Sequence, residues 1–225
     1  MGDYIVTGAR RGIGREVALA LAEQGHAVWA LSRTPLDPSE WPAGIRLRAV
    51  DPVRLEDWLA LVEELQASDR NVAGVINSAG YLVRKPLENL TPADFAESFA
   101  ANATAPAMAV QALMPLFSPD VHVVTLSSMG GFQGSVKFPG MAAYSSSKAA
   151  AVCLTEVLQT EFNDRGWSFN VLCLGAVQTE MLAEAFPGFE APVSAEEMGR
   201  YVADFVCTGH RFFRGKVLPV SSTTP

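Results

Sequence analysis

The sequence predicts an α/β fold in which a doubly wound parallel β-sheet carries helices on both faces. Short apolar segments alternate with helical segments along the whole chain, which is the pattern of βαβ units. Several apolar segments are continuous runs of Val, Ile and Leu, as expected for strands buried on both faces of a parallel sheet. The length of 225 residues suits one such domain of about seven strands and is short for two. We therefore expect a single domain over residues 1–225.

The expected elements follow from apolar periodicity and from capping and turn residues. Strands are expected over residues 3–7, 27–31, 45–50, 72–76, 121–126, 169–174 and 216–220. Helices are expected over residues 13–24, 55–66, 91–117 and 142–164, with a last helix beginning at Ser194. The segment Thr91-Pro92-Ala93-Asp94 is typical of a helix start, because Thr caps free amides, Pro fits the first turn and the acid faces the positive end of the dipole.

Composition and charge argue against several classes of function. The formal net charge of −7 is unsuited to general nucleic-acid binding. The most apolar long stretch, residues 98–117, contains Asn, Thr, Gln and two prolines, so we expect a buried helix there and no membrane span. The three cysteines and three histidines lack the spacing of a disulfide framework or a metal site, so no metal is expected. A strand begins within the first residues and leaves no space for a leader, so we expect a cytoplasmic protein.

A glycine-rich loop follows the first expected strand. It reads Thr-Gly-Ala-Arg-Arg-Gly-Ile-Gly over residues 7–14 and leads directly into a helix. Glycines permit a tight turn and let the backbone approach a pyrophosphate, whose charge then meets the start of the helix. In this strand–loop–helix context, the loop predicts a phosphate-binding site.

This loop resembles the cofactor fingerprint of the short-chain dehydrogenase/reductase family. Later strand ends extend the resemblance through Tyr144-x-x-x-Lys148, the serine pair Ser127-Ser128, Asn102, and the turn over residues 77–80. The resemblance covers residues 3–220. It implies a Rossmann-like fold and an oxidoreductase that moves a hydride between a nicotinamide and a carbonyl or alcohol carbon.

The resemblance assigns four catalytic residues, namely Asn102, Ser128, Tyr144 and Lys148. The serine would hold the substrate oxygen, and the asparagine would support a proton relay through the lysine. The separation between the serine pair and Tyr144 is longer than the family usually shows, with the extra length within residues 130–140. The choice between Ser127 and Ser128 therefore stays open.

Tyr144 and Lys148 are four residues apart, so they project from the same face of the expected helix. A phenol with a pKa near 10 is a poor base at neutral pH. The neighbouring ammonium and a positively charged oxidised nicotinamide are expected to lower that pKa. Tyr144 would then accept the alcohol proton in oxidation or donate a proton to the carbonyl oxygen in reduction.

The residues after the second expected strand bear on the choice of cofactor. An acid there would bind the ribose hydroxyls of NAD, but none occurs before Asp37. Arg33 and Arg11 resemble the basic pair that binds the 2′-phosphate in NADP-dependent members, so we expect NADP(H), with NAD(H) as the alternative. The residues that the resemblance assigns to the dinucleotide are Gly8, Arg10, Arg11, Gly12, Ile13, Gly14, Arg33, Asp51, Pro52, Asn77, Ala79, Gly80, Tyr144, Lys148, Val177 and Thr179.

The substrate is expected to meet an apolar lid over residues 180–193. Its large apolar side chains are Met181, Leu182, Phe186 and Phe189. We expect a small apolar ketone or aldehyde, with a 3-oxoacyl thioester as an alternative and a non-catalytic NADP-binding redox sensor as the alternative of another class. The family commonly assembles through its two long helices, here near 91–117 and 142–164, so a homodimer or homotetramer is expected.

Overall fold

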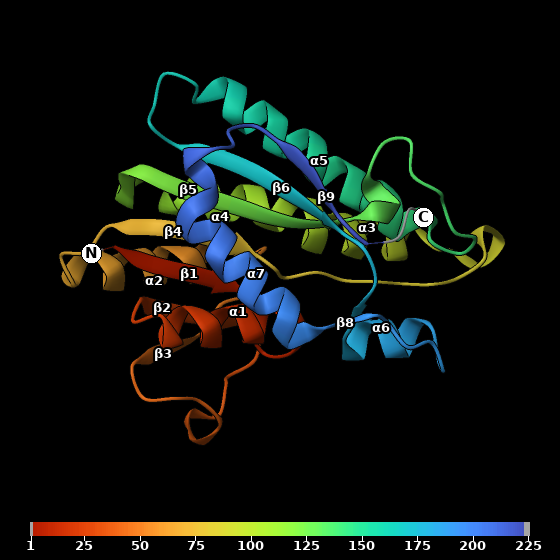
Figure 1. Ribbon diagram of the computed structural model, residues 1–225, viewed down its shortest axis with the longest axis horizontal. Helices are drawn as coiled ribbons and strands as arrows, with labels where there is room; N and C mark the ends of the chain where they lie inside the picture. Colours follow the sequence, from red (N-terminus) through yellow and green to blue (C-terminus); the bar gives the residue numbers. More distant parts are fainter. Residues whose placement is uncertain (1, 223–225) are drawn as a thin grey trace.

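The computed structural model describes residues 2–222, so both ends of the expected 1–225 range lie outside the described part. Seven parallel strands form one sheet in the order β3-β2-β1-β4-β5-β6-β9 (Figure 1). The strands are β1 (Asp3–Thr7), β2 (Ala27–Ser32), β3 (Ile45–Ala49), β4 (Val72–Asn77), β5 (Phe117–Ser128), β6 (Ser168–Leu174) and β9 (Val217–Val220). The expected α/β class with a doubly wound parallel sheet is confirmed.

Helices cover both faces of this sheet. On one face, α1 and α7 pack side by side, and on the other lie α2, α4 and α5 (Figure 1). The main helices are α1 (Gly12–Glu23), α2 (Leu55–Ala67), α3 (Pro92–Phe99), α4 (Ala105–Leu113), α5 (Ala142–Glu161) and α7 (Ala195–Thr208). Short 3₁₀ turns are η1 (Pro38–Glu40), η2 (Leu87–Asn89), η4 (Met114–Leu116), η5 (Met129–Gly131) and η6 (Gly209–Arg211).

Strand β1, which lies inside the sheet between β2 and β4, explains why two layers of helices are needed. All five of its residues are buried. Successive side chains of a strand point to opposite faces, so Val6 joins the apolar cluster under α1 and α7 while Ile5 joins the cluster under α2 and α4. A strand buried on both sides needs apolar side chains on both faces, and Tyr4, Ile5 and Val6 supply them in the middle of β1.

The expected helix over residues 91–117 is interrupted. It begins as predicted, since Thr91 and Asp94 form a reciprocal capping box before α3. A π-helical turn, η3 (Ala100–Thr104), then separates α3 from α4. Pro106 has no N–H to donate to the carbonyl of Asn102 four residues earlier, so a regular α-helix could not continue through this point. The next strand, β5, begins at Phe117 rather than at residue 121.

The expected lid contains elements that the sequence pattern does not indicate. A short helix, α6 (Glu180–Ala185), begins after Thr179, whose Oγ1 accepts a hydrogen bond from the Leu182 N–H at 3.2 Å. Two short strands, β7 (Val177–Gln178) and β8 (Val193–Ser194), pair on either side of it. Figure 1 shows α6 beyond the carboxyl ends of the central strands. Among the described residues, no helix has both the length and the apolar character needed to cross a bilayer.

Candidate active site

A cavity of about 1250 Å³ lies at the carboxyl edge of the sheet. Parallel α/β sheets bind their ligands at this edge, where loops from several strands meet. All the predicted catalytic and dinucleotide residues line this cavity except Asn77 and Asn102, which lie behind it. Ser127 lines it as well. The fold therefore brings together residues that are far apart in the sequence.

The glycine loop packs against the loop that follows β4. Gly8 has a φ of +68°, and a Cβ built on it would lie 2.6 Å from the Ala79 Cα, so only glycine fits at this position. The Thr7 hydroxyl accepts hydrogen bonds from the N–H groups of Ser78 and Ala79, each at 3.1 Å. These contacts fix the two loops that the resemblance assigns to the dinucleotide.

The start of α1 suits a phosphate group. Its N-cap residue, Arg11, makes no side-chain capping bond, and the first turn carries no acidic residue. The N–H groups of this first turn therefore have no side-chain partner that a phosphate would need to displace. The residues present fit the pyrophosphate of a dinucleotide.

The end of the cavity beside β2 is basic. Arg10 donates a hydrogen bond to the Thr34 hydroxyl, and Arg33, also exposed, makes no ion pair within the described residues. The Asp51 carboxylate, after β3, accepts a hydrogen bond from the Val53 N–H at 3.2 Å. No acidic residue follows β2 at the position where a ribose hydroxyl of NAD would be recognised.

Arg11 lines the cavity with the other predicted dinucleotide residues and also contacts the lid. Its guanidinium forms an ion pair with Glu184 of α6, with Nη1 2.6 Å from Oε1. This pairing lowers the pKa of Glu184 and raises that of Arg11, and the nearby Glu180 carboxylate adds to the second effect. In this structure Arg11 contacts the lid, whereas the sequence assigned it to the phosphate.

Ser128, Tyr144 and Lys148 meet at the other end of the cavity. The Ser128 hydroxyl hydrogen-bonds the Tyr144 phenol, and the Lys148 Nζ lies 5.9 Å from the centre of the Tyr144 ring. The Ser127 hydroxyl instead donates to the Lys148 carbonyl at 2.9 Å and is buried. Of the two serines, only Ser128 has its hydroxyl beside the phenol.

Burial shifts the pKa values of both Tyr144 and Lys148. It raises the pKa of Tyr144 to about 12, and the hydrogen bond from Ser128 opposes this by a smaller amount. Burial also lowers the pKa of Lys148 to about 8. The expected lowering of the phenol's pKa is therefore absent from the protein without dinucleotide. It stays a prediction for the complex, in which a positively charged nicotinamide adds to the effect of the ammonium.

Asn102 lies in the π-helical turn, and its side chain is held on three sides. Its Nδ2 donates to the Tyr81 carbonyl at 2.8 Å and to the Ser147 hydroxyl at 2.9 Å, and its Oδ1 accepts from the Tyr81 N–H at 2.9 Å. A Cβ on Gly80 would lie 3.1 Å from this Oδ1 and 3.5 Å from the Lys148 Nζ. The absence of a side chain at Gly80 thus leaves a gap between Asn102 and Lys148.

The cavity beside Tyr144 has a largely apolar wall. Met181, Leu182, Phe186 and Phe189 of the lid all line it, as the sequence predicts, and the segment after β5 adds Met129, Phe138 and Met141. Phe138 and Phe189 are about half exposed, so this wall is open toward solvent.

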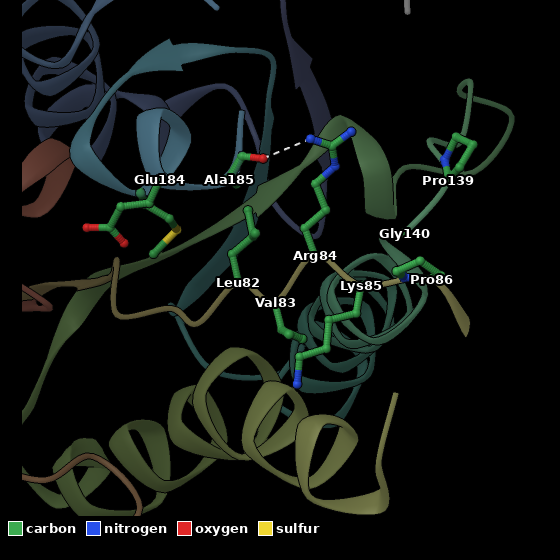
Figure 2. Close-up of a pocket in the computed structure, with 10 residues that line it drawn as sticks. Leu82, Val83, Arg84, Lys85, Pro86, Pro139, Gly140, Glu184 and Ala185 are labelled. Atoms are coloured by element: carbon green, nitrogen blue, oxygen red, sulfur yellow. Dashed lines mark hydrogen bonds between the residues drawn. The ribbon is translucent and has the colours of Figure 1, made fainter. Parts of the chain in front are cut away.

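A smaller cavity of about 640 Å³ adjoins this wall and is shown in Figure 2. It shares Leu82 and Met181 with the larger cavity. Arg84, in the loop after β4, donates from Nη1 to the Ala185 carbonyl at 2.9 Å and lies 4.3 Å from the centre of the Phe186 ring. Arg84 therefore holds the end of α6 from the side opposite to Arg11.

Comparison with known proteins identifies the family. The short chain dehydrogenase model matches residues 4–188, so the chain belongs to the short-chain dehydrogenase/reductase family. The protein is therefore an oxidoreductase that acts on alcohol or carbonyl groups.

Relatives of known name share about a quarter to a third of their residues with this chain. Benzil reductase ((S)-benzoin forming) of Bacillus subtilis is 29% identical over 80% of this chain and 76% of its own length. Hydroxynaphthalene reductase of Aspergillus fumigatus is 28% identical over 86% of this chain and 74% of its own length. A solved dehydrogenase/reductase from Sinorhizobium meliloti 1021 is 28% identical, with a TM-score of 0.83 over 97% of this chain and 93% of that chain.

Three contacts of the site were not predicted. Ser147 binds Asn102, Glu184 binds Arg11, and Arg84 binds the end of α6. In the last two contacts the paired residues lie 173 and 101 positions apart in the sequence, so no local pattern indicates these contacts. Ser147 is one residue before Lys148 and could have been singled out only as part of that motif.

Proposed function

We propose that this protein is an NADP(H)-dependent reductase of ketones and aldehydes that carry apolar, especially aromatic, substituents. The observation that carries the proposal is one continuous cavity. It joins a Ser128–Tyr144–Lys148 cluster at one end to an arginine-rich end beside β2. A reductase needs both parts within reach of one bound dinucleotide.

The basic end of the cavity supports NADP(H) over NAD(H). Arg10, Arg33 and Thr34 offer two guanidinium groups and a hydroxyl around the same end of the cavity. A phosphate monoester forms charge-assisted, bidentate hydrogen bonds with guanidinium groups. A ribose without a 2′-phosphate would bring no anion to these two cations.

The other end supports proton transfer to a carbonyl oxygen. When bound, the nicotinamide ring supplies or receives the hydride. We assign Ser128 to hold the substrate oxygen and Tyr144 to donate its proton to that oxygen in reduction. A phenol is protonated at neutral pH, so Tyr144 has a proton to donate in this direction. Lys148, held by its Nζ to the Leu126 carbonyl at 2.8 Å, is a cation beside the phenol, and Asn102 supports the passage of protons toward it.

The substrate class follows from the apolar wall. Aromatic and methionine side chains of the lid and of the segment after β5 surround the space beside Tyr144. Such a surface binds flat apolar groups by burial and ring stacking. The names of the benzil and hydroxynaphthalene reductases, both of which refer to aromatic compounds, agree with this choice.

We further propose a homodimer or homotetramer in the cytoplasm, without nucleic-acid or membrane partners. Helices α3 and α5 leave large apolar side chains exposed, among them Phe99 and Val157, and a second copy of the chain would cover them. Light scattering at several protein concentrations tests the assembly, and a monomer at all of them would contradict it.

The function is tested by following NADPH and NADH consumption with a panel of carbonyl compounds. Aromatic ketones such as benzil should be reduced with a higher kcat/KM than aliphatic ketones or 3-oxoacyl thioesters, and NADPH should be preferred to NADH. Preference for the thioesters would favour the acyl-thioester alternative. Tight dinucleotide binding with no turnover of any carbonyl would favour the redox sensor.

The serine pair provides a matched test of the assigned site. Ser128→Ala should lower kcat/KM about 100-fold, because a hydrogen bond to the reacting oxygen is lost. Ser127→Ala, which removes a buried bond to the Lys148 carbonyl, should cost less than about tenfold, mainly through stability. A larger loss for Ser127→Ala would reverse the assignment.

A further inference from the structure

Two consecutive arginines of the glycine loop reach in different directions. Arg10 donates a hydrogen bond to Thr34, which follows β2. Arg11 reaches α6 instead and pairs with Glu184, its Nη1 lying 2.6 Å from Oε1 and its Nη2 3.5 Å from Oε2. Consecutive residues of one loop are therefore engaged with different elements of the cavity.

The surroundings of the two arginines differ in charge. Arg10 has a hydroxyl partner and shares its end of the cavity with Arg33, which makes no ion pair in residues 2–222. The charge of Arg11 is already balanced by the Glu184 carboxylate, with Glu180 close by. A dianionic phosphate is attracted to the first arginine and would have to displace a carboxylate from the second.

The helix that Arg11 holds depends on such contacts. With six residues, α6 is too short to be stable by itself in water. Arg84 fixes its carboxyl end through the Ala185 carbonyl and the Phe186 ring. In Figure 2 the Glu184 side chain extends away from Arg84, toward the opposite side of the helix. The lid is thus attached to the loop after β4 on one side and to the glycine loop on the other.

We propose that Arg10 and Arg11 have separate roles: Arg10, with Arg33 and Thr34, selects the 2′-phosphate of NADP(H), while Arg11 clasps the lid over the bound dinucleotide through Glu184. This inference rests on the proposed function and revises the expected role of Arg11. Loss of Arg10 should change which dinucleotide is preferred. Loss of the Arg11–Glu184 clasp should shorten the residence time of both dinucleotides equally, because the lid covers them alike.

The expected magnitudes differ for the two arginines. A charge-assisted bond to a phosphate is among the stronger polar contacts, so Arg10→Met should lower the preference for NADPH over NADH by about tenfold or more. The side chains of Arg11 and Glu184 are 47% and 65% exposed, and an exposed ion pair contributes little. Breaking the clasp should therefore raise both dissociation rates only about twofold to fivefold.

The experiment measures affinity and dissociation of NADPH and NADH by stopped-flow fluorescence with the full chain. The variants are Arg10→Met, Arg11→Met, Glu184→Gln and the double variant Arg11→Met/Glu184→Gln. Glu196→Gln is the matched control, because Glu196 forms an exposed ion pair with Arg200 at 2.8 Å on α7. Both clasp variants should leave the NADPH preference unchanged, the double variant should equal either single one, and the control should match the wild type.

The opposite pattern would overturn the inference. If Arg11 binds the phosphate, Arg11→Met will lower the preference for NADPH, and Glu184→Gln will raise it by releasing the guanidinium. A wild type that prefers NADH would refute the role of Arg10, and binding of neither dinucleotide would refute the proposed function.

Hydrogen exchange of the α6 amides in the protein without dinucleotide tests the Arg11–Glu184 clasp independently of the dinucleotide-binding results. Exchange should rise in Arg11→Met and Glu184→Gln but not in Glu196→Gln. Unchanged exchange in both clasp variants would refute the clasp whatever the dinucleotide results.

Discussion

Buried ionisable groups differ in their charged partners between the amino edge of the central sheet, where the strands begin, and the carboxyl edge, where they end. At the amino edge, the Asp3 side chain is fully buried, accepts a hydrogen bond from the Trp29 Nε1 at 2.8 Å and forms ion pairs with Arg46 and Arg70. At the carboxyl edge, Lys148 is also buried, but no carboxylate among the described residues pairs with it.

This difference indicates that the amino edge stabilises the fold, whereas the carboxyl edge is suited to chemistry. A buried charge with partners is stable in one protonation state, so the amino edge contributes to the fold. A buried ammonium without a counter-ion has its pKa displaced toward neutrality, here to about 8, and can respond to a neighbouring proton transfer. A buried ionisable group can therefore take part in the reaction only where no group of opposite charge is paired with it.

The largest effect is expected at the carboxyl edge. Tyr144→Phe removes the proposed proton donor and should lower kcat about 1000-fold, equivalent to about 4 kcal/mol in the activation free energy. Dinucleotide affinity and the midpoint of thermal unfolding should stay near those of the wild type. A residual rate within tenfold of the wild type would remove Tyr144 from the mechanism.

A smaller effect, on stability alone, is expected from His122, which lies on β5 toward the amino side. Its Nδ1 donates to the Val206 carbonyl and its Nε2 accepts from the Asn170 amide, both at 2.9 Å, so the neutral ring is bound. Burial lowers its pKa from 6.5 to about 4. The unfolded chain therefore binds the proton first, and stability should fall as the pH drops from 6.5 to 4, by about 3 kcal/mol in total.

Urea unfolding at a series of pH values measures this dependence. The variant His122→Gln should be less stable at pH 7 but should lack this part of the slope. An equal slope in the variant and the wild type would assign the dependence to other groups.

The smallest effect is expected from Asp3, the buried carboxylate that forms ion pairs with two arginines. Asp3→Asn keeps the size of the side chain but removes the carboxylate charge that pairs with Arg46 and Arg70, and it should lower the free energy of unfolding by about 2 kcal/mol. The kcat at a temperature well below unfolding should be unchanged, because the site lies at the other edge. A loss of kcat without a loss of stability would break the distinction between the two edges.

The strands of the sheet could be predicted because most of them are local apolar segments bounded by turn residues. The prediction failed where a proline interrupts a helix and where contacts between distant parts of the chain decide the outcome. The π-helical turn around Asn102 arises from a proline four residues later, and α6 exists because Arg11, Arg84 and the Thr179 cap support a segment too short to form a helix alone. The early start of β5 at Phe117 follows from its pairing with Val72 of β4.

Local patterns are enough to predict the parallel α/β architecture, the glycine loop at the first strand and the Tyr144–Lys148 pair on one helix face, because periodicity and spacing are properties of neighbouring residues. The three-dimensional arrangement was needed to show that Ser128 rather than Ser127 lies beside the phenol, and that Arg10 and Arg11 engage different parts of the cavity. Those choices depend on which elements meet in space, and the contact between Arg11 and Glu184, 173 positions apart, leaves no mark in the local sequence.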